Sequence, residues 1–375
     1  MKKYLNFLIK FKYNIINMEK KKKIIIIGFG WGSVNFLKYI NTDIYDVLVI
    51  SNNKSFVYTP LLAQNIKDNK NLELDINDIN NKISLIENEV KNIEFDNNKV
   101  ITSNHKVNYD YLILSHGSCV NTFNIPGVKE NCYFLKSNND ANKLRYLLLN
   151  LPKGSNIAVI GCGLTGSEIV GTLIDYNKFK ITAIDAVPRP LTIFKSKLSD
   201  FTTNIWNLNK VNLYMNHMVS KITKDTIYFK NDNKINYDLS IWCGGIKLST
   251  LTKVIMETLN MKNNKGIEIN NMLKVKNTKN VWAIGDCAYS GNPPTAQVAY
   301  QQGYYLAKQF NSKFTNKNEF YFKNKGQIGY ICNKNSIYQN NYFTASGNLV
   351  YYLNTLIHLY KSVNCKQMVN LFIKN

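Results

Sequence analysis

The 375-residue chain is poor in arginine, histidine and acidic residues. It contains two arginines, four histidines and 25 acids against 47 lysines and arginines together, so lysine carries nearly all of the formal net charge of +22. Four histidines and seven cysteines without a CxxC pair predict no metal site and no disulfide framework. The odd, irregularly spaced cysteines instead predict reduced thiols in a reducing compartment.

Long apolar runs and nucleic-acid-binding patterns are absent too. No stretch of 18 apolar residues occurs, so we expect no membrane-spanning helix. The only dense basic run, Lys20–Lys23, is not interleaved with aromatic residues, so we expect no nucleic-acid partner. The lysine excess reflects either compositional drift or contact with an anionic lipid surface. The basic residues 1–23 are either a targeting presequence or a simple extension.

What is present is a strand, a glycine turn and a helix at residues 21–40, "KKKIIIIGFGWGSVNFLKYI". The isoleucine run is typical of a buried parallel strand, and the apolar residues after the glycines recur with helical spacing. "YDVLVIS" follows as a second strand that ends at Ser51. Together these segments predict a βαβ unit.

The same pattern returns at residues 157–186, "IAVIGCGLTGSEIVGTLIDYNKFKITAIDA". Its strand runs into Gly161, Gly163 and Gly166, a complete G-x-G-x-x-G. We expect a helix from about Ser167 and a second strand that ends on Asp185. One such motif is weak evidence, but two, each between a predicted strand and helix, strongly indicate dinucleotide binding.

In such a motif the first glycine permits a tight turn, the second admits a pyrophosphate, and the third allows close packing of helix on strand. The helix N-terminus then presents free N–H groups to the anion. The first copy departs from this form, because Gly32 comes one place early and Ser33 stands at the third glycine's place. Small residues at both places keep the mechanism plausible. We therefore predict pyrophosphate contacts at Gly28, Gly30 and Gly32.

Three further segments complete the pattern. "NVWAIGDCA" (residues 280–288) predicts a strand that ends on Gly285 and Asp286, and "NPPTAQVAYQQGYYLAKQF" (292–310) predicts a helix after two prolines. "GNLVYYLNTLIHLYK" predicts an amphipathic helix with an apolar face. The residues of that predicted face are Leu349, Leu353, Ile357 and Tyr360.

The sequence as a whole predicts an α/β protein with two Rossmann-type dinucleotide-binding domains and a C-terminal amphipathic element. The predicted boundaries are residues 1–23 for the extension, 24–140 with 265–330 for the first domain, 141–264 for the second, and 331–375 for the C-terminal element.

In its motifs the chain resembles the type II NADH:quinone oxidoreductases, the single-chain alternative NADH dehydrogenases, and most of all their eukaryotic members. "IIGFGWGSVNFLK", "SFVYTPLL" (55–62) and "YDYLILSHGSCVNTFNIPGV" (109–128) are similar to the family's first signatures. "GCGLTGSEIVGTL", "VWAIGDCA", "PPTAQVAYQQG" and "GNLVYYLNTLIHLYK" are similar to its later ones, in the same order. The resemblance covers nearly the whole chain after residue 23.

The resemblance implies a two-dinucleotide-binding flavoprotein fold, with FAD in the first domain and NADH in the second. The C-terminal element would hold the enzyme on one face of a membrane, from which quinone would reach the flavin. The family also suggests a homodimer and a peripheral position on the mitochondrial inner membrane. The tail departs from the family, with tyrosines in place of the usual tryptophan.

Roles for the residues near the nucleotides follow from the motifs and the resemblance. Asp185 would accept bonds from the adenosine ribose of NADH and repel a 2′-phosphate, which favours NADH over NADPH. Ser51 stands where many FAD enzymes carry an acid, and a serine accepts that bond more weakly. The resemblance places Thr59 and Pro60 beside the flavin ring. Asp286, after Gly285, would accept a bond from a ribityl hydroxyl.

The candidate catalytic residues are Glu168, Gln297 and Gln301. In the family the matching glutamate lies near the nicotinamide and flavin, although Thr172 replaces a second acid that members often carry. Gln297 and Gln301 share one helix face because they are four residues apart. The resemblance places this face at the flavin and the quinone pocket, where an amide donates to a quinone carbonyl.

The predicted reaction passes a hydride from NADH to FAD and two electrons on to quinone, without proton pumping. A sulfide:quinone oxidoreductase, or another FAD-dependent pyridine-nucleotide oxidoreductase, shares the fold and remains an alternative. Sulfide chemistry needs redox cysteines, for which Cys332 is a candidate. A non-enzymatic alternative is a membrane-associated nucleotide-binding redox sensor.

Overall fold

The computed structural model describes residues 21–362, which form two compact units. Unit 1 comprises the residues up to Phe56, Asp75–Gly117 and Leu248–Phe322. Unit 2 comprises Val57–Leu74, Ser118–Lys247 and the residues from Lys323 onward. Residues 57–74, 118–140 and 323–330, which the sequence suggested for the first domain, cluster with unit 2, and residues 248–264, suggested for the second, cluster with unit 1. Residues 1–20 of the basic extension lie outside the described residues.

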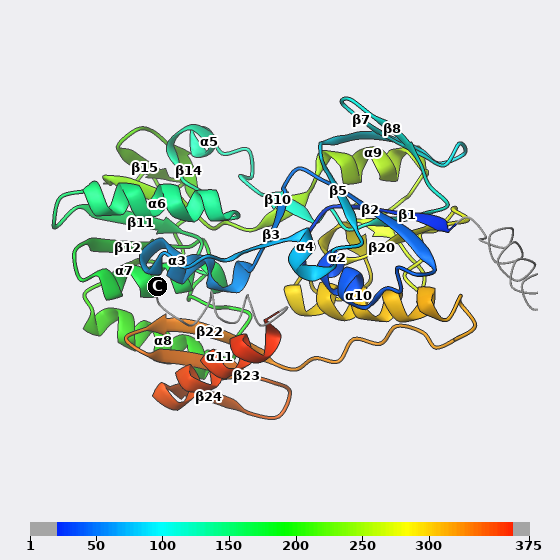
Figure 1. Ribbon diagram of the computed structural model, residues 1–375. Coiled ribbons are helices and arrows are strands. Elements are labelled where there is room, and N and C mark those ends of the chain that lie inside the picture. The colour runs from blue at the N-terminus through cyan, green and yellow to red at the C-terminus, as the bar shows by residue number, and fades with distance from the viewer. Residues whose placement is uncertain (1–20, 363–375) are drawn as a thin grey trace, which may run out of the picture. The chain divides into compact units, whose positions relative to one another are not determined.

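Unit 1 is built on a parallel sheet of five strands in the order β20-β9-β1-β2-β5. The polyisoleucine strand β1 (Lys22–Ile27) is central, and Ile24–Ile27 are buried because both faces of the sheet are covered. Helices α2 and α10 pack side by side in this unit (Figure 1). The sheet strands are β2 (Tyr45–Ser51), β5 (Ser84–Glu87), β9 (Tyr111–Leu114) and β20 (Val281–Ala283).

The rest of unit 1 supports this sheet. A hydrophobic cluster joins its strands to a three-stranded antiparallel sheet and to α9 (Thr250–Thr258). The antiparallel strands are β6 (Val90–Glu94), β7 (Lys99–Thr102) and β8 (Lys106–Asn108). The other elements are α2 (Trp31–Tyr39), α4 (Ile76–Ile79), β19 (Ile267–Glu268), η2 (Gly285–Cys287), β21 (Ala288–Tyr289) and α10 (Ala296–Asn311).

Unit 2 repeats the design on a four-stranded parallel sheet in the order β13-β12-β11-β17. The central strand is β11 (Asn156–Ile160), and α7 (Leu164–Tyr176) packs against it. A second hydrophobic cluster joins this sheet to the antiparallel sheet β14-β15-β16. The strands are β12 (Lys180–Ile184), β13 (Asn212–Tyr214), β14 (Val219–Ile222), β15 (Thr226–Phe229), β16 (Lys234–Asn236) and β17 (Leu239–Trp242).

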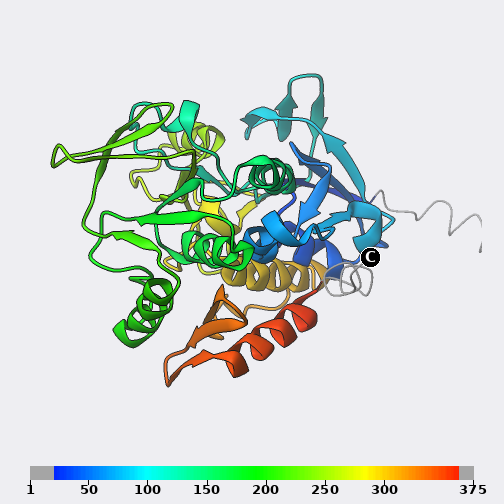
Figure 2. The same cartoon turned by 90° about the vertical axis from the view of Figure 1, so that its left-hand side faces the viewer.

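The last part of unit 2 is an antiparallel sheet with a helix beside it. α11 (Asn348–Lys361) runs along this sheet, as Figure 2 shows, while α7 packs against its strand β22. The strands are β22 (Gln327–Cys332), β23 (Asn335–Gln339) and β24 (Thr344–Gly347). The remaining helices of unit 2 are η1 (Thr59–Leu61), α3 (Leu62–Asp68), α5 (Val128–Asn131), α6 (Asn138–Asn150) and α8 (Ser196–Leu208).

Three short strands lie where the chain passes between the units: β3 (Ser55–Val57), β4 (Glu73–Asp75) and β18 (Ile246–Leu248). β10 (Ser118–Val120) pairs with β18. Within residues 21–362, no helix is long and apolar enough to cross a membrane.

Both predicted βαβ units are confirmed, with one difference at a helix start. α7 begins at Leu164, three residues before the predicted Ser167, so Gly163 is its N-cap and Gly166 lies inside the helix. In each parallel sheet the chain continues first to one side of the central strand and later returns to the other side. The carboxyl end of that strand is thus a topological switch point, where ligands of open α/β sheets bind.

Candidate functional site

The glycine turn of unit 1 leaves β1 through a conformation that only glycine adopts easily. Gly28 has φ +99°, and a Cβ on it would stand 2.4 Å from the carbonyl oxygen of Ser115. Its N–H donates to the carbonyl of Ile50 at 2.8 Å, which ties the turn to β2. The first predicted glycine is therefore required by the fold at this strand end.

Gly30 follows as the N-cap of α2 and faces open space, since a Cβ built on it has no atom within 4 Å. No side chain caps this helix and its first turn carries no acid, and such a helix N-terminus suits an anion. Gly32 is buried in the helix, where a Cβ on it would stand 2.9 Å from the Ile284 side chain and 3.0 Å from the Ser115 hydroxyl oxygen. The visible role of Gly32 is thus close packing of α2 against these side chains.

Unit 2 forms the same turn with its complete motif. Gly161 has φ +95°, and its Cβ would stand 2.6 Å from the carbonyl group of Cys243. Gly163, the N-cap of α7, again faces open space and has no side-chain cap. A Cβ on Gly166 would lie 1.8 Å from the carbonyl oxygen of Gly161, so this glycine allows the helix to approach the strand.

The serine at the third glycine's place in unit 1 has a compensating contact that the sequence did not reveal. The hydroxyl of Ser33 donates to the carbonyl of Gly28 at 2.7 Å. The first turn therefore replaces close packing by a hydrogen bond to the same carbonyl. The only indication of this contact in the sequence was that residue 33 is small and carries a hydroxyl donor.

Asp185 directly follows β12 and is partly buried. Its carboxylate accepts the N–H of Cys162 at 2.6 Å and that of Val187 at 3.2 Å, which holds it against the glycine turn. A carboxylate has about four acceptor positions, so it can also accept from two ribose hydroxyls. Ser51, at the end of β2, is only 6% exposed, and its hydroxyl accepts the N–H of Asn53 at 3.1 Å.

In unit 2, Glu168 on α7 lies against β22. Its Oε1 accepts the N–H of Tyr330 at 3.4 Å, and a Cβ on Gly171, one turn later, would stand 1.8 Å from the carbonyl oxygen of Ile331. Burial raises the pKa of Glu168 to about 8, although the Tyr330 N–H acts in the opposite direction. Glu168 is therefore largely protonated at neutral pH. The glycine at position 171 was the sequence signal for this packing.

Replacing Glu168 with glutamine should change how stability depends on pH. The folded protein binds the Glu168 proton more tightly than the unfolded chain, so this group's contribution is full below pH 4.5 and is lost as pH rises through about 8. We expect Glu168→Gln to gain about 1–2 kcal/mol relative to the native chain between pH 5.5 and pH 9, because partial burial reduces the effect. Urea unfolding at both pH values measures this, with the exposed Glu257→Gln as control. The prediction is contradicted if the free energies of unfolding of the native chain and of Glu168→Gln change equally between the two pH values.

Four predicted residues of unit 1 lie on or beside α10. Gly285 and Asp286 form the turn after β20, and Gln297 and Gln301 are partly exposed on α10. The buried Gln302 joins the two features, because its Oε1 accepts the Gly285 N–H at 2.7 Å. Sequence analysis missed Gln302, because the sequence alone does not show which of the adjacent glutamines is buried.

Thr59 and Pro60 belong to unit 2, where they begin η1 directly after the buried Tyr58. The Tyr58 hydroxyl lies 3.0 Å from Nδ1 of His358 on α11. Burial lowers the pKa of His358 to about 4, with help from nearby lysines, so its ring is neutral at pH 7. Sequence reasoning missed this pair, since a lone histidine in an amphipathic helix gives no signal.

A cavity of about 370 Å³ lies within unit 2 between α3, α7, β22 and α11, and His358 and Asn354 line it. Its wall holds two basic and two acidic side chains, Lys67 and Lys70 with Asp68 and Asp175, and Lys70 pairs with Asp68 at 3.4 Å. Asn354 is 5% exposed, and its Oδ1 has no hydrogen-bond partner. The cavity is thus polar but carries little net charge.

The cysteines of the described region are free thiols, as expected. Cys332 is fully buried, and burial, with Asp175 nearby, raises the pKa of its thiol to about 12. A protonated, inaccessible thiol is a poor nucleophile, which disfavours sulfide chemistry at this residue. Among residues 21–362 no group of histidines, cysteines and acids could hold a metal ion.

Both glycine turns fit a dinucleotide pyrophosphate. Each has a helix N-terminus without a side-chain cap and a glycine that faces open space. Two residues before that glycine, each has a glycine with positive φ. The fold and the site thus define a protein with two dinucleotide-binding turns. Residues 22–303 match the family model described as pyridine nucleotide-disulphide oxidoreductase, and the chain belongs to that family.

Relatives within this family agree with the resemblance seen in the motifs. The chain is 31% identical to a protein of Dictyostelium discoideum named as a probable NADH dehydrogenase, over 88% of this chain and 83% of that protein. It is 30% identical to a protein of Schizosaccharomyces pombe named as a probable mitochondrial NADH-ubiquinone oxidoreductase, over 78% of this chain, and spans 62% of that protein's length.

A solved structure is similar over almost the whole chain. The NDH2 of Plasmodium falciparum in complex with NADH has a TM-score of 0.87 and 25% identity, covering 95% of this chain and 97% of that chain. The predicted membership of the type II NADH dehydrogenases and the predicted fold class are thereby confirmed. The family and this neighbour also support FAD and NADH as cofactors.

Proposed function

We propose that the chain is an FAD-dependent NADH:quinone oxidoreductase that does not pump protons. The observation that carries this proposal is the pair of open glycine turns, one at the central strand end of each unit. The turn at Gly28 and Gly30 would hold FAD, and the turn at Gly161 and Gly163 would hold NADH. Bound FAD would supply hydride acceptance from NADH and electron transfer to quinone.

The chain's own residues would position the reactants. Asp185 would bind the ribose of NADH, and Asp286 would accept from a ribityl hydroxyl of FAD. Glu168, protonated at neutral pH, could donate a hydrogen bond or proton near the nicotinamide, and Gln301 would donate to a quinone carbonyl. The neutral polar cavity beneath α11 offers hydrogen-bonding groups suited to an uncharged quinone ring.

The experiment is an absorbance spectrum of the purified protein, followed by NADH and then a short-chain ubiquinone. Flavin bands that NADH bleaches and ubiquinone restores would support the proposal. A colourless protein that stays so after incubation with FAD would overturn it. Bleaching without reoxidation by ubiquinone would favour the redox-sensor alternative, and sulfide-dependent quinone reduction would favour the sulfide:quinone alternative.

We also propose that α11 holds the protein on a membrane surface, in a mitochondrion as in several named relatives. The helix exposes large apolar side chains and turns polar ones inward, since Asn354 is buried. Ile357, which was predicted for the apolar face, is partly buried. The exposed apolar residues of α11 are Leu349, Tyr352, Leu353, Leu356 and Tyr360. The homodimer that the family resemblance suggests also belongs to this proposal.

Replacing Leu356 with aspartate should reduce binding to anionic liposomes at least about ten-fold, because an inserted leucine contributes about 1.5–3 kcal/mol and a carboxylate is repelled. Flotation with phosphatidylserine-containing liposomes in low salt measures this. Leu149→Asp on α6 is a matched control, since Leu149 is 61% exposed and Leu356 is 60% exposed. Equal losses in both variants, or no flotation of the native protein, would contradict membrane contact through α11.

A further inference from the structure

The two parallel sheets differ at the end of the strand next to the central one. In unit 2 that strand, β12, is followed by Asp185, whose carboxylate faces the glycine turn. In unit 1 the corresponding strand, β2, ends on Ser51, whose hydroxyl already accepts the Asn53 N–H. Ser51 is also only 6% exposed. The first nucleotide site therefore lacks a carboxylate where the second has one.

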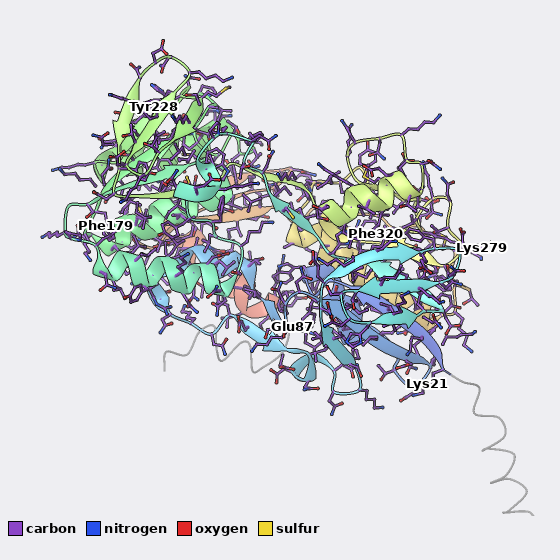
Figure 3. All side chains as sticks on the ribbon, turned by 90° about the horizontal axis from the view of Figure 1, so that it is seen from above. Lys21, Glu87, Phe179, Tyr228, Lys279 and Phe320 are labelled. Atoms are coloured by element: carbon purple, nitrogen blue, oxygen red, sulfur yellow. The ribbon has the colours of Figure 1, made fainter. Side chains whose placement is uncertain are left out.

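The next strand of the same sheet supplies a carboxylate at the same edge. β5 runs parallel to β2, and Ser51 stands in register with Glu87, the last residue of β5. Figure 3 labels Glu87. The N–H of Asn88 donates to the Ser51 carbonyl at 2.9 Å, so the two strand ends are tied together directly after Glu87. Paired strands lie about 4.8 Å apart, which the longer glutamate side chain can span.

The Glu87 side chain is exposed and makes no hydrogen bond or ion pair with any residue of the described region. Glu89, two residues later, differs in that it pairs with Lys91. A glutamate side chain that is held at the carboxyl edge of a parallel sheet and has no partner among the described residues is suited to accept from ligand hydroxyls.

We propose that Glu87 binds the ribose hydroxyls of the adenosine half of FAD, in place of the acid that β2 lacks. This inference rests on the proposed FAD site at Gly28 and Gly30. In unit 1 the adenosine contact would thus come from β5, two strands away from β1 in the sheet. In unit 2 it would come from the end of β12, the strand next to β11. Glu87 is thus a binding residue that acts on cofactor retention and takes no part in the redox step.

The test measures dissociation constants of the apoprotein for FAD and for FMN by flavin fluorescence. FMN lacks the adenosine half, so Glu87→Gln should weaken FAD binding about ten-fold to a hundred-fold and leave FMN binding unchanged. Glu87→Asp should recover part of the loss, and Glu89→Gln should bind both flavins like the native chain. Thermal unfolding of the apoproteins checks that all variants fold.

The outcomes separate this inference from the proposed function. If the native chain binds FAD while Glu87→Gln retains its affinity, or loses FAD and FMN binding equally, Glu87 has no adenosine contact and the FAD proposal stands. If the native chain binds neither flavin, the proposed function itself fails and this inference falls with it.

Discussion

Replacing Gly28 with alanine should give a protein that is less stable and contains no flavin. The new Cβ would lie 2.4 Å from the Ser115 carbonyl oxygen and 2.6 Å from the His116 Cα, both of them backbone atoms. No rotamer change can relieve this overlap, so β1 and β9 must move apart. The positive φ adds about 1–2 kcal/mol of strain, and we expect a total destabilisation of about 3–5 kcal/mol.

Chemical unfolding and the flavin absorbance of the purified variant measure the two effects. Gly291→Ala is the matched control in the same unit, because Gly291 has φ +74° but a Cβ there meets no atom within 4 Å. The control should show the strain without the overlap and should keep its flavin. A Gly28→Ala protein as yellow and as stable as this control would contradict the assignment of the first glycine turn.

Replacing Asp185 with asparagine should move nucleotide preference about a hundred-fold towards NADPH. The amide oxygen can still accept the Cys162 N–H that the carboxylate accepts at 2.6 Å, so the glycine turn should persist. Two charge-assisted bonds to the ribose become weaker, and the repulsion of a 2′-phosphate disappears. We expect kcat/KM to fall about ten-fold for NADH and to rise about ten-fold for NADPH.

Steady-state kinetics with each nucleotide measure the ratio of the two kcat/KM values. Asp200→Asn removes the same charge from an exposed position on α8 of the same unit, so it controls for general electrostatics. If both variants shift the ratio equally, the effect belongs to net charge and Asp185 is not the ribose acceptor.

The two βαβ units could be predicted because local sequence determines them. A four-isoleucine strand and a complete glycine motif fix strand, turn and helix within about 30 residues. The structure added the reason for the first motif's irregularity, namely that the Ser33 hydroxyl bonds the Gly28 carbonyl. Such a contact depends on a side-chain direction that residue spacing does not encode.

Features that depend on distant segments could not be predicted. The packing of Gly171 against Ile331, which places Glu168 beside β22, joins residues far apart in the chain. The predicted apolar face of α11 included the partly buried Ile357 and left out the exposed Tyr352 and Leu356, because the sequence does not show which side of the helix packs against the sheet. Periodicity shows that a helix is amphipathic, but its orientation depends on what it packs against.

The interleaving of the two units along the chain has a consequence for synthesis on the ribosome. Strand β20, which completes the unit 1 sheet by pairing with β9, exists only once residues 281–283 have been made. Unit 2 likewise needs β22, which begins at Gln327, before α7 is covered. Nascent chains should therefore hold open sheet edges until late in translation, and truncation before residue 281 should leave neither unit able to complete its fold.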